Sequence, residues 1–369
     1  MRKKINFQKK YIKYVLIVLA FAMLFLASFH DAFYKQTIVK IKQVENTSLG
    51  DKENSFGQTE QTYDQSITAV ITNGSSKGKT VTFSNRFSTS ETLSDEYKKG
   101  DKLFVKLKDD SDSPAISILY EKRDSYIYLF AGIFILMLVL IFQKQGVMTL
   151  LSCGVNIVFF FFCLQFYESE DFFNWLWMLE IAFFLVVTLL FVSGFHKKTL
   201  GAILSCFVTV ALVSALYMFT ISQDADISYE MMPCMLPNLP LAKVFMISTV
   251  IGMLGAVMDI AVTINASVSE LMVTSQHCTR KSIVDSIVEI GHDTMGTMVN
   301  VLFFSYLSGS FPLIVLKFSN GYGLDTIVSV DYIFDIIRFL TGSIGIVLAI
   351  PISGLIAVIL FRKGLVKEA

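Results

Sequence analysis

The sequence is poor in charged side chains and contains none of the short motifs that mark common enzyme classes. Charged residues make up 17% of its 369 positions, against roughly 25% in soluble domains. A P-loop, a nucleophile elbow, an HExxH pair and a Gly-rich dinucleotide fingerprint are all absent. We therefore expect no enzyme activity and no cofactor, and ATP-driven work would need another subunit.

Cysteine is also scarce, and its spacing argues against the usual zinc and redox motifs. None of the five cysteines belongs to a CxxC pair. Cys153, Cys163 and Cys206 fall in apolar runs, where cysteine behaves as a small apolar side chain. The polar region 35–124 has no cysteine, so a disulfide scaffold does not support it. The remaining metal alternative is a Met–Cys copper site within 226–243.

What the sequence has in abundance is long apolar blocks. Hydrophobic residues make up 53% of the chain, and phenylalanine alone occurs 33 times. A block of about 20 apolar residues is long enough to cross a bilayer as a helix. The sequence therefore predicts a polytopic α-helical membrane protein with about eight spans. We place the spans near residues 14–31, 125–142, 147–167, 173–195, 199–221, 241–265, 297–317 and 338–361.

The placement of lysine and arginine predicts the orientation of these spans. The N-terminus, MRKKINFQKKYIK, is strongly basic. The segments after the second, fourth, sixth and eighth spans are basic, whereas the intervening YESEDFFN, SQDADISYE and GLDTIVSVDYIFD are acidic. Because basic loops tend to stay in the cytoplasm, we expect both termini to be cytoplasmic. The formal net charge of zero hides this asymmetry and gives no reason to expect nucleic acid as a partner.

The first apolar run has two interpretations, an uncleaved anchor or a cleaved signal peptide. The sequence after it, ASFHDAFYK, has Phe and His where cleavage needs small residues, which favours the anchor. We therefore divide the chain into five parts. They are a basic cytoplasmic N-terminus at 1–13, an anchor at 14–31, an extracytoplasmic domain at 32–124, a seven-helix transmembrane domain at 125–361 and a cytoplasmic C-terminus at 362–369.

The region 32–124 has the pattern of a small all-β domain. Short runs of alternating apolar and polar residues are bounded by turn residues, and the Asn-Gly of NGSSKG indicates a hairpin. This pattern predicts a small OB-like barrel or a sandwich. We interpret the polar segment 49–62 as a mobile loop. The candidate strands are QTIVKIKQV, SITAVIT, KTVTFSN, DKLFVKL and AISILYE.

The most informative residue is Asp259, a carboxylate inside the apolar stretch 241–263. At mid-membrane such a group costs roughly 2.5–3.5 kcal/mol unless it faces protein, water or a partner. Helical spacing puts Gly252, Gly255 and Asp259 close to one face. Because small residues let helices approach closely, we expect this face to look into a helix bundle. Asp259 is then either a hydrogen-bonding anchor or an ion- or proton-binding carboxylate.

A second polar group lies where the seventh span begins. Asp293, Thr297 and Asn300 recur at four and seven residues and so share a helix face. Asp293 alone is equally well explained as a complement to the positive helix end. Carboxylate, amide and hydroxyl oxygens together suit a hard cation or a relayed proton. We therefore predict an ion or substrate pathway in the cytoplasmic half, formed by Asp259, Asn265, His292, Asp293, Thr297 and Asn300.

Other residues have secondary roles in this prediction. Glu180 is a further candidate, although Trp175 and Trp177 place it near the interface, where a carboxylate can reach water. Pro351 should bend the last span and acts either as a hinge or in packing alone. The segment 281–290, KSIVDSIVEI, has the pattern of an amphipathic helix lying on the inner membrane surface. The predicted helix-packing glycines are Gly252, Gly255, Gly342 and Gly345.

Three stretches carry a family resemblance. They are GMLGAVMDIAVTINASVSEL at 252–271, GHDTMGTMVNVLFFSYLSGSFPL at 291–313 and RFLTGSIGIVLAIPISGLIAVI at 338–359. Together with the outer β-domain, they resemble the longer, domain-bearing type of the YibE/F-like family of bacterial multipass membrane proteins. The resemblance implies a bacterial cell membrane location. Because short members are often encoded beside a long one, it also implies a hetero-oligomer with a shorter paralogue, with a homo-oligomer as the alternative.

The sequence departs from the family pattern at two of the predicted site residues. His292 stands where the family usually has arginine, and Asn265 lies in a run that is usually small Ser and Ala. If the family's arginine pairs with the following aspartate, His292 would make that pair pH-dependent.

Two functions follow as hypotheses. The first is a transporter or permease component in the lipid bilayer that moves an unknown small solute or ion. The second is a non-transporting module whose outer β-domain senses or docks a ligand or an envelope partner. An enzyme acting on lipid inside the membrane is a distant third.

Overall fold

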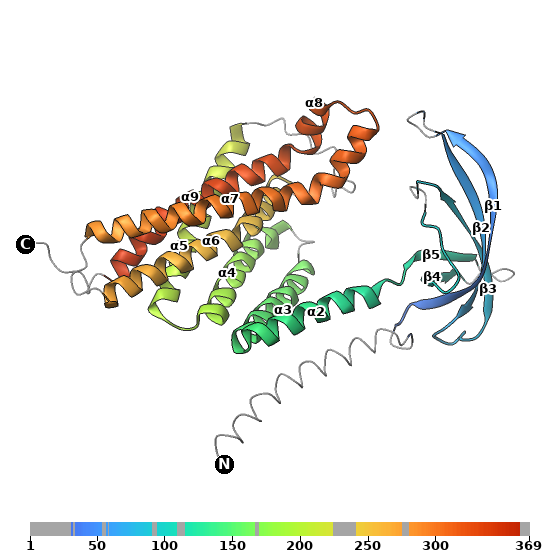
Figure 1. Ribbon diagram of the computed structural model, residues 1–369, viewed down its shortest axis with the longest axis horizontal. Coiled ribbons are helices and arrows are strands. Elements are labelled where there is room, and N and C mark those ends of the chain that lie inside the picture. Colours follow the sequence, from blue (N-terminus) through green and yellow to red (C-terminus); the bar gives the residue numbers. More distant parts are fainter. Residues whose placement is uncertain are drawn as a thin grey trace, which may run out of the picture. The chain divides into compact units, whose positions relative to one another are not determined.

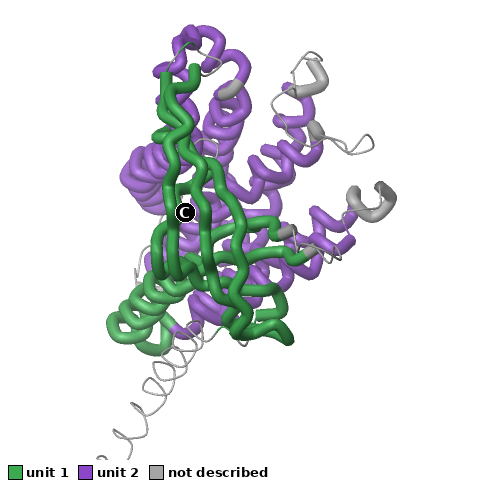
Figure 2. Tube along the Cα trace, turned by 90° about the vertical axis from the view of Figure 1, so that its right-hand side faces the viewer, with its two compact units in different colours: residues 1–146 green, residues 147–369 purple. Residues whose placement is uncertain are grey.

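The structure, a computed structural model, describes residues 31, 34–53, 57, 59–90, 94–108, 115–166, 170–223, 241–274 and 280–361. The chain divides into two compact units, Met1–Gly146 and Val147–Ala369 (Figure 2). The predicted first span at 14–31 lies outside the described residues except for Asp31. The Pro- and Met-rich segment 226–240, which holds most of the alternative copper site, also lies outside them.

The first unit contains one antiparallel sheet of five strands in the order β3-β2-β1-β4-β5 (Figure 1). Each strand covers one of the five predicted runs, so the all-β prediction is confirmed. The predicted Asn-Gly hairpin joins β2 to β3, with Gly74 and Gly78 at φ of 72° and 90°. The strands are Thr37–Glu53 (β1), Thr59–Ile71 (β2), Thr80–Ser88 (β3), Lys102–Lys108 (β4) and Ala115–Glu121 (β5).

The main buried cluster of this unit lies on one face of the sheet. Val39, Ile67 and Leu103, from three adjacent strands, are fully buried, because alternate side chains of a strand point to the same face. Side chains of the edge strands β3 and β5 pack on the same cluster, so the sheet curls around it. Among the described residues, no ladder pairs the edge strands β3 and β5, so the curled sheet does not close into a barrel.

The segment 49–62 is not the predicted mobile loop where the structure describes it. β1 and β2 remain paired as far as Glu53 and Thr59 and form a polar extension, the β1–β2 arm, at 47–53 and 59–64. Most side chains of the β1 part are exposed. The sequence pattern did not reveal the arm because a strand without a buried face has no apolar alternation, and backbone pairing alone defines it.

A buried polar network ties the loop before β4 to the sheet. The Gln65 side chain is fully buried, and its Nε2 donates to the Tyr97 carbonyl at 2.9 Å. Asn85 Nδ2 donates to Gln65 Oε1 at 3.2 Å and to the Asp95 carbonyl at 3.0 Å. Because unpaired buried amides are costly, these bonds fix residues 95–97 against the sheet.

Seven long apolar helices follow the sheet in the described residues, which confirms the polytopic helical architecture. Each overlaps one of the predicted spans from the second to the eighth. The short α8 (Leu324–Thr326) and a π-helical turn (Ile327–Asp331) precede the last of them. The long helices are Asp124–Phe142 (α2), Lys144–Leu164 (α3), Glu170–Ser193 (α4), Lys197–Gln223 (α5), Leu241–Thr274 (α6), Arg280–Ser319 (α7) and Ile333–Phe361 (α9).

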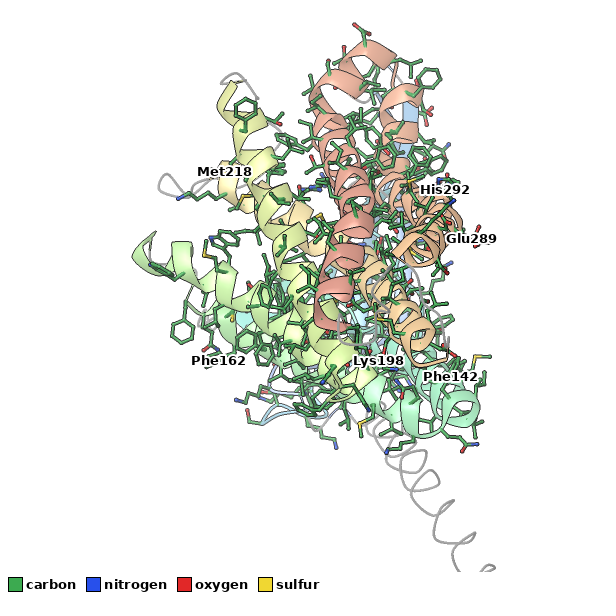
Figure 3. All side chains as sticks on the ribbon, turned by 90° about the vertical axis from the view of Figure 1, so that its left-hand side faces the viewer. Phe142, Phe162, Lys198, Met218, Glu289 and His292 are labelled. Atoms are coloured by element: carbon green, nitrogen blue, oxygen red, sulfur yellow. The ribbon has the colours of Figure 1, made fainter. Side chains whose placement is uncertain are left out.

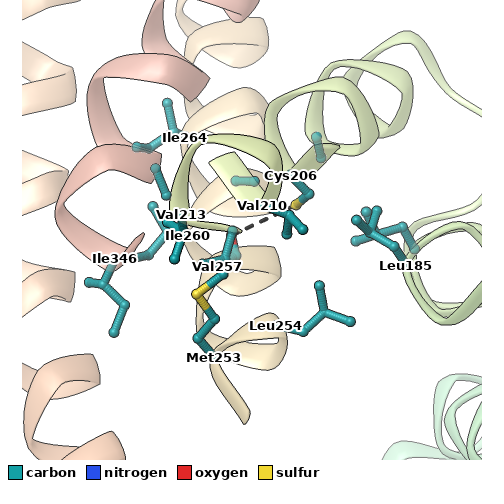
Figure 4. Close-up of a cluster of buried hydrophobic side chains, with 14 of the residues drawn as sticks. Leu185, Cys206, Val210, Val213, Met253, Leu254, Val257, Ile260, Ile264 and Ile346 are labelled. Carbon is teal, nitrogen blue, oxygen red and sulfur yellow. Dashed lines mark hydrogen bonds between the residues drawn. The ribbon is translucent and has the colours of Figure 1, made fainter. Parts of the chain in front are cut away.

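The second unit is built around α6, which packs most extensively against α5 and α9. Met253, Ile260 and Ile264 on α6 are fully buried among side chains of these neighbours (Figure 4). Cys206 on α5 lies in the same cluster, where its Sγ approaches the Val257 carbonyl at 3.9 Å. Cysteine therefore acts here as the small packing residue that its position in an apolar run predicts.

Helix α7 begins much earlier than the predicted span at 297–317. It is continuous from Arg280 to Ser319, so KSIVDSIVEI forms its first turns and is not a separate surface helix. Ile283 and Ile287, the apolar stripe of that segment, are buried. A Cβ placed on Gly354 of α9 would lie 2.9 Å from Ile287 Cδ1, which shows how closely the two helices pack.

Candidate functional site

Asp259 lies on an exposed side of α6 together with Gly252 and Gly255. At Gly252, Tyr306 of α7 covers the helix so closely that an added Cβ would overlap the tyrosine hydroxyl. At Gly255, nothing lies within 4 Å of the Cβ position. The face that we expected to look into the bundle is therefore covered at Gly252, but is left open at Gly255 and Asp259.

A cavity of about 500 Å³ adjoins this open part of α6. α3, α4 and α6 form its wall, which reaches α6 at Gly255 and Met258, immediately before Asp259. Asn156 of α3 lines the cavity, and its Nδ2 donates to Thr188 Oγ1 of α4 at 2.8 Å. Asn156 Oδ1 and Ser152 Oγ are buried and have no hydrogen-bond partner among the described residues. The largely apolar wall thus offers two free acceptor oxygens.

Asn265 is buried one and a half turns beyond Asp259 on α6. Its Nδ2 donates to the Ala261 carbonyl at 2.8 Å and approaches Ser205 Oγ of α5 at 3.4 Å. A Cβ on Gly201 of α5 would overlap Asn265 Oδ1. The structure therefore places Asn265 at the α5–α6 contact, as an amide that helps to join two helices.

The polar residues predicted on α7 are exposed, and two of them bond to their own helix. Thr297 Oγ1 donates to the Thr294 carbonyl at 2.9 Å, and Asn300 Nδ2 donates to the Gly296 carbonyl at 2.7 Å. His292 lies on the outer side of α7 near Glu289 (Figure 3). Within the described part of the chain, no hydrogen bond or ion pair joins any two of the six predicted pathway residues.

A second, apolar groove of about 670 Å³ runs between α7 and α9. Among the described residues, His292 is the one ionisable side chain that lines it, and Pro351 lines it from α9. α9 continues through Pro351 to Phe361. The predicted gating histidine and hinge proline thus border the same groove, although they lie on different helices.

Glu180 differs from the expectation of a carboxylate that reaches the interface. Its side chain is only 1% exposed. The neighbouring Ile181 and Leu185 belong to the buried cluster around α6, which shows that this stretch of α4 faces the helical core. The nearby Trp175, on which the interfacial prediction rests, is 76% exposed. The tryptophan indicates the level of the interface but not the direction of the neighbouring side chains.

The packing glycines other than Gly255 have close neighbours. A Cβ on Gly342 would lie 3.4 Å from Met253 Cβ and from Leu302 Cδ1. A Cβ on Gly345 would lie 2.8 Å from Met253 Sδ and 3.2 Å from Val213 Cγ2. Small residues at these positions therefore allow α9 to approach α6 and α5 closely.

Sequence reasoning missed a cluster of three polar residues, the Arg338 centre, formed by Ser310, Asp335 and Arg338. Arg338 Nη1 donates to Asp335 Oδ1 at 3.0 Å, and Ser310 Oγ of α7 donates to Asp335 Oδ2. The guanidinium carbon lies 5.2 Å from the centroid of the Phe245 ring of α6. The Tyr306 hydroxyl and Arg338 Nε are buried without a hydrogen-bond partner among the described residues.

The signal for this centre is present in the sequence DYIFDIIRFL. Asp335 and Arg338 are three residues apart, the spacing of an ion pair on one helix face. The acidic segment GLDTIVSVDYIFD predicts a loop that includes Asp335, whereas the predicted last span, 338–361, starts at Arg338. Because α9 begins at Ile333, both residues belong to the apolar helix, and the pair could have been recognised from that boundary.

Two family models match the chain. One, described as YibE/F-like protein, matches residues 130–363, and the other, described as the YibE/F family N-terminal domain, matches residues 32–119. The chain belongs to the YibE/F-like family. No curated protein and no solved structure matched it.

The two matches fall on different parts of this YibE/F-like protein. The N-terminal match spans all the strands except the last two residues of β5, and the longer match spans α3 to α9. All six predicted pathway residues and the Arg338 centre lie in the longer match. The resemblance inferred from the three sequence stretches is thereby confirmed.

Proposed function

We propose that this integral membrane protein is a component of a transporter in which Asp259 binds an ion or a proton. The observation that carries the proposal is the position of Asp259, an exposed carboxylate on an apolar helix next to a cavity with free polar oxygens. A carboxylate at such a place is costly unless water, protein or an ion satisfies it. Carboxylates inside membrane helices commonly mark ion and proton pathways for that reason.

The residues on α7 would extend this site. α6 and α7 pack against each other, and Asp293, Thr297 and Asn300 add carboxylate, hydroxyl and amide oxygens on the neighbouring helix. Thr297 and Asn300 bond to their own backbone. Binding a cation would therefore exchange two weak local bonds for ligand contacts, which are the kind of oxygen contacts that hard cations require.

Proton flux through proteoliposomes with a trapped pH-sensitive dye tests the proposal. Under an imposed membrane potential, the wild-type protein should carry a flux that Asp259→Asn abolishes, because the amide cannot take up a proton. Asp285→Asn is the matched control, since Asp285 is an exposed carboxylate in the first turns of α7 and lies outside the proposed pathway.

The comparison has two decisive outcomes. Loss of flux in Asp259→Asn but not in Asp285→Asn supports a titrating carboxylate on the pathway. Full flux in Asp259→Asn at equal protein content contradicts the proposed role of Asp259.

One observation favours the second candidate function, docking of a partner by the sheet domain. The β1–β2 arm extends a paired, polar ladder beyond the core of the sheet, and the buried cluster of the sheet contains no residue of the arm. A protruding ladder of this kind suits recognition of another protein. Under this alternative, loss of the arm would abolish function while Asp259→Asn would leave it intact.

A further inference from the structure

We propose that the cavity between α3, α4 and α6 binds an uncharged, largely apolar molecule whose hydroxyl group is held by Ser152 and Asn156. We call this cavity of about 500 Å³ the α3 cavity, after the helix that supplies both residues. The proposal concerns a second ligand, separate from the ion at Asp259, and it concerns binding alone. It therefore goes beyond the proposed transport function and does not depend on it.

Ser152 and Asn156 meet at one ligand space. Both residues line the α3 cavity, and they are four residues apart on one helix, which brings their Cβ atoms to about 5–6 Å from each other. Ser152 Oγ and Asn156 Oδ1 are buried and have no hydrogen-bond partner among the described residues. At this spacing, a single polar group of a bound molecule can reach both oxygens.

The Asn156 amide is fixed with its oxygen unused. Asn156 Nδ2 donates to Thr188 Oγ1 of α4 at 2.8 Å, and Thr188 lines the same cavity. This bond holds the planar amide and leaves Oδ1, which can only accept hydrogen bonds. A buried acceptor without a donor is costly, so a donor that arrives with a ligand would stabilise this arrangement.

Ser152 differs from Ser205 and Thr209, two buried hydroxyl residues of α5. Those two donate to the carbonyls four residues before them, at 2.7 Å and 2.8 Å, which is a usual way to satisfy a hydroxyl in a helix. Ser152 is only 3% exposed, yet its hydroxyl makes no such bond within the described part of the chain. It is therefore available to donate a hydrogen bond to a ligand or to accept one.

A hydroxyl is the ligand group that satisfies both residues at once. It donates its proton to Asn156 Oδ1 and accepts a hydrogen bond from Ser152 Oγ. A charged group fits less well, because no lining residue among those described carries a charge. Asp259 follows Met258 in the chain without lining the cavity. A charge without a counter-charge is costly inside a membrane, so the ligand should be uncharged.

The rest of the wall fits an apolar ring. Phe160 of α3 and Phe184 of α4 line the cavity together with Leu254 of α6, and aromatic side chains pack on the faces and edges of other rings. At Gly255 of α6, nothing lies within 4 Å of the Cβ position, which leaves room at that wall. A volume of about 500 Å³ is in the range of sites that hold molecules of drug size. The chemistry therefore favours a ring-bearing alcohol or phenol.

Equilibrium binding of radiolabelled 2-naphthol tests the proposal. This probe is a two-ring phenol that is uncharged at pH 7, as the phenol of tyrosine is. The full-length protein would be studied in phosphatidylcholine nanodiscs, and nanodiscs without protein measure the amount of probe that dissolves in lipid. Unlabelled 2-naphthol, 2-methylnaphthalene and 2-naphthylmethylamine would then compete with the probe. The second compound has no hydroxyl, and the third carries a positive charge.

We expect saturable binding above the lipid background, with 2-naphthol competing about tenfold more strongly than the other two compounds. Ser152→Ala and Asn156→Leu should each weaken binding by roughly fivefold to tenfold, the effect of losing one hydrogen bond between uncharged groups. Ser214→Ala is the matched control and should leave binding unchanged. Ser214 Oγ is also buried without a partner among the described residues, but Ser214 lines a different cavity.

Any of four results would overturn the proposal. Binding that never exceeds the lipid background would leave the cavity to acyl chains. Equal competition by 2-methylnaphthalene would remove the role of the hydroxyl, and stronger competition by the amine would assign the cavity to cations. Equal affinities of the wild type, Ser152→Ala and Asn156→Leu would place the probe outside the α3 cavity. Because no proton gradient is involved, failure here leaves the flux test of Asp259 untouched.

Discussion

Gly252 and Gly255 show that identical residues one turn apart on α6 have different roles. A Cβ at position 252 would overlap the Tyr306 hydroxyl, whereas the same atom at position 255 has nothing within 4 Å. Residue spacing predicts the same packing role for both, because it identifies a helix face but not which neighbour covers each part of that face.

Gly252→Ala should therefore destabilise the helical unit by about 1–3 kcal/mol, the usual cost of forcing an extra carbon into a packed contact. Gly255→Ala is the matched control and should leave stability unchanged or slightly raised, since alanine favours a helix by about 1 kcal/mol over glycine. Thermal unfolding midpoints in detergent micelles measure both effects. Equal midpoints for the two variants would contradict a tight contact between Gly252 and Tyr306.

Tyr97 gives the sheet domain a predictable dependence on alkaline pH. Burial raises the pKa of its hydroxyl, with the charge of Asp95 acting in the same direction. The unfolded chain then ionises first, near the ordinary tyrosine pKa of about 10. The neutral Tyr97 hydroxyl therefore contributes fully to the stability of the fold below that pH. This contribution is lost as the pH rises through the raised pKa of the folded state.

We expect urea unfolding of the sheet to become easier above about pH 10, and Tyr97→Phe should reduce this dependence. Circular dichroism of the β signal at neutral and alkaline pH measures it. Tyr126→Phe serves as the control because the Tyr126 side chain is 70% exposed. A pH dependence identical in the wild type and both variants would show that Tyr97 does not cause it.

At the scale of elements, the β1–β2 arm and the start of α7 diverge from their sequence patterns in opposite ways. The arm is a regular ladder without apolar alternation, so its polar sequence resembles a loop. The start of α7 has a clear apolar stripe that resembles a surface helix, yet Ile283 and Ile287 bury it against α9. In both cases the partner segment decides the structure, through backbone pairing in the arm and side-chain packing in α7.

Because the buried cluster of the sheet includes no residue of the arm, the core should survive its removal. Replacing residues 48–63 by an Asn-Gly turn joins Thr47 to Asp64, which are register partners. We expect the amides of Val39 and Ile67 to keep their protection from hydrogen exchange. Loss of that protection would mean that the arm contributes to the stability of the core.

At the scale of the whole molecule, the division into two units makes the two proposed functions separable. Each unit has a buried cluster of its own, and Asp259 and the Arg338 centre both belong to the second. A transporter based on Asp259 does not need the sheet for its pathway, whereas a docking module needs it entirely.

Deletion of residues 35–121 should therefore leave part of the proton flux, while Asp259→Asn abolishes it. The deletion keeps α2, so the predicted alternation of the spans is preserved. The same dye-loaded proteoliposomes measure both proteins, and protein content by immunoblot controls for insertion. Complete loss of flux in the deletion, with Asp259→Asn still active, would favour the docking function.

The sequence by itself determined the class, the strands and the long helices of this YibE/F-like protein. Length and apolar composition define a membrane helix, and alternation defines a half-buried strand, so both patterns are local. Only the tertiary structure decided which polar residues meet. Asn265 bonds within the α5–α6 contact, Asp259 adjoins a cavity, and Arg338 pairs with Asp335 beside Ser310 of α7. Contacts between polar residues of different helices depend on how whole helices pack. The spacing of residues along one helix does not contain that information.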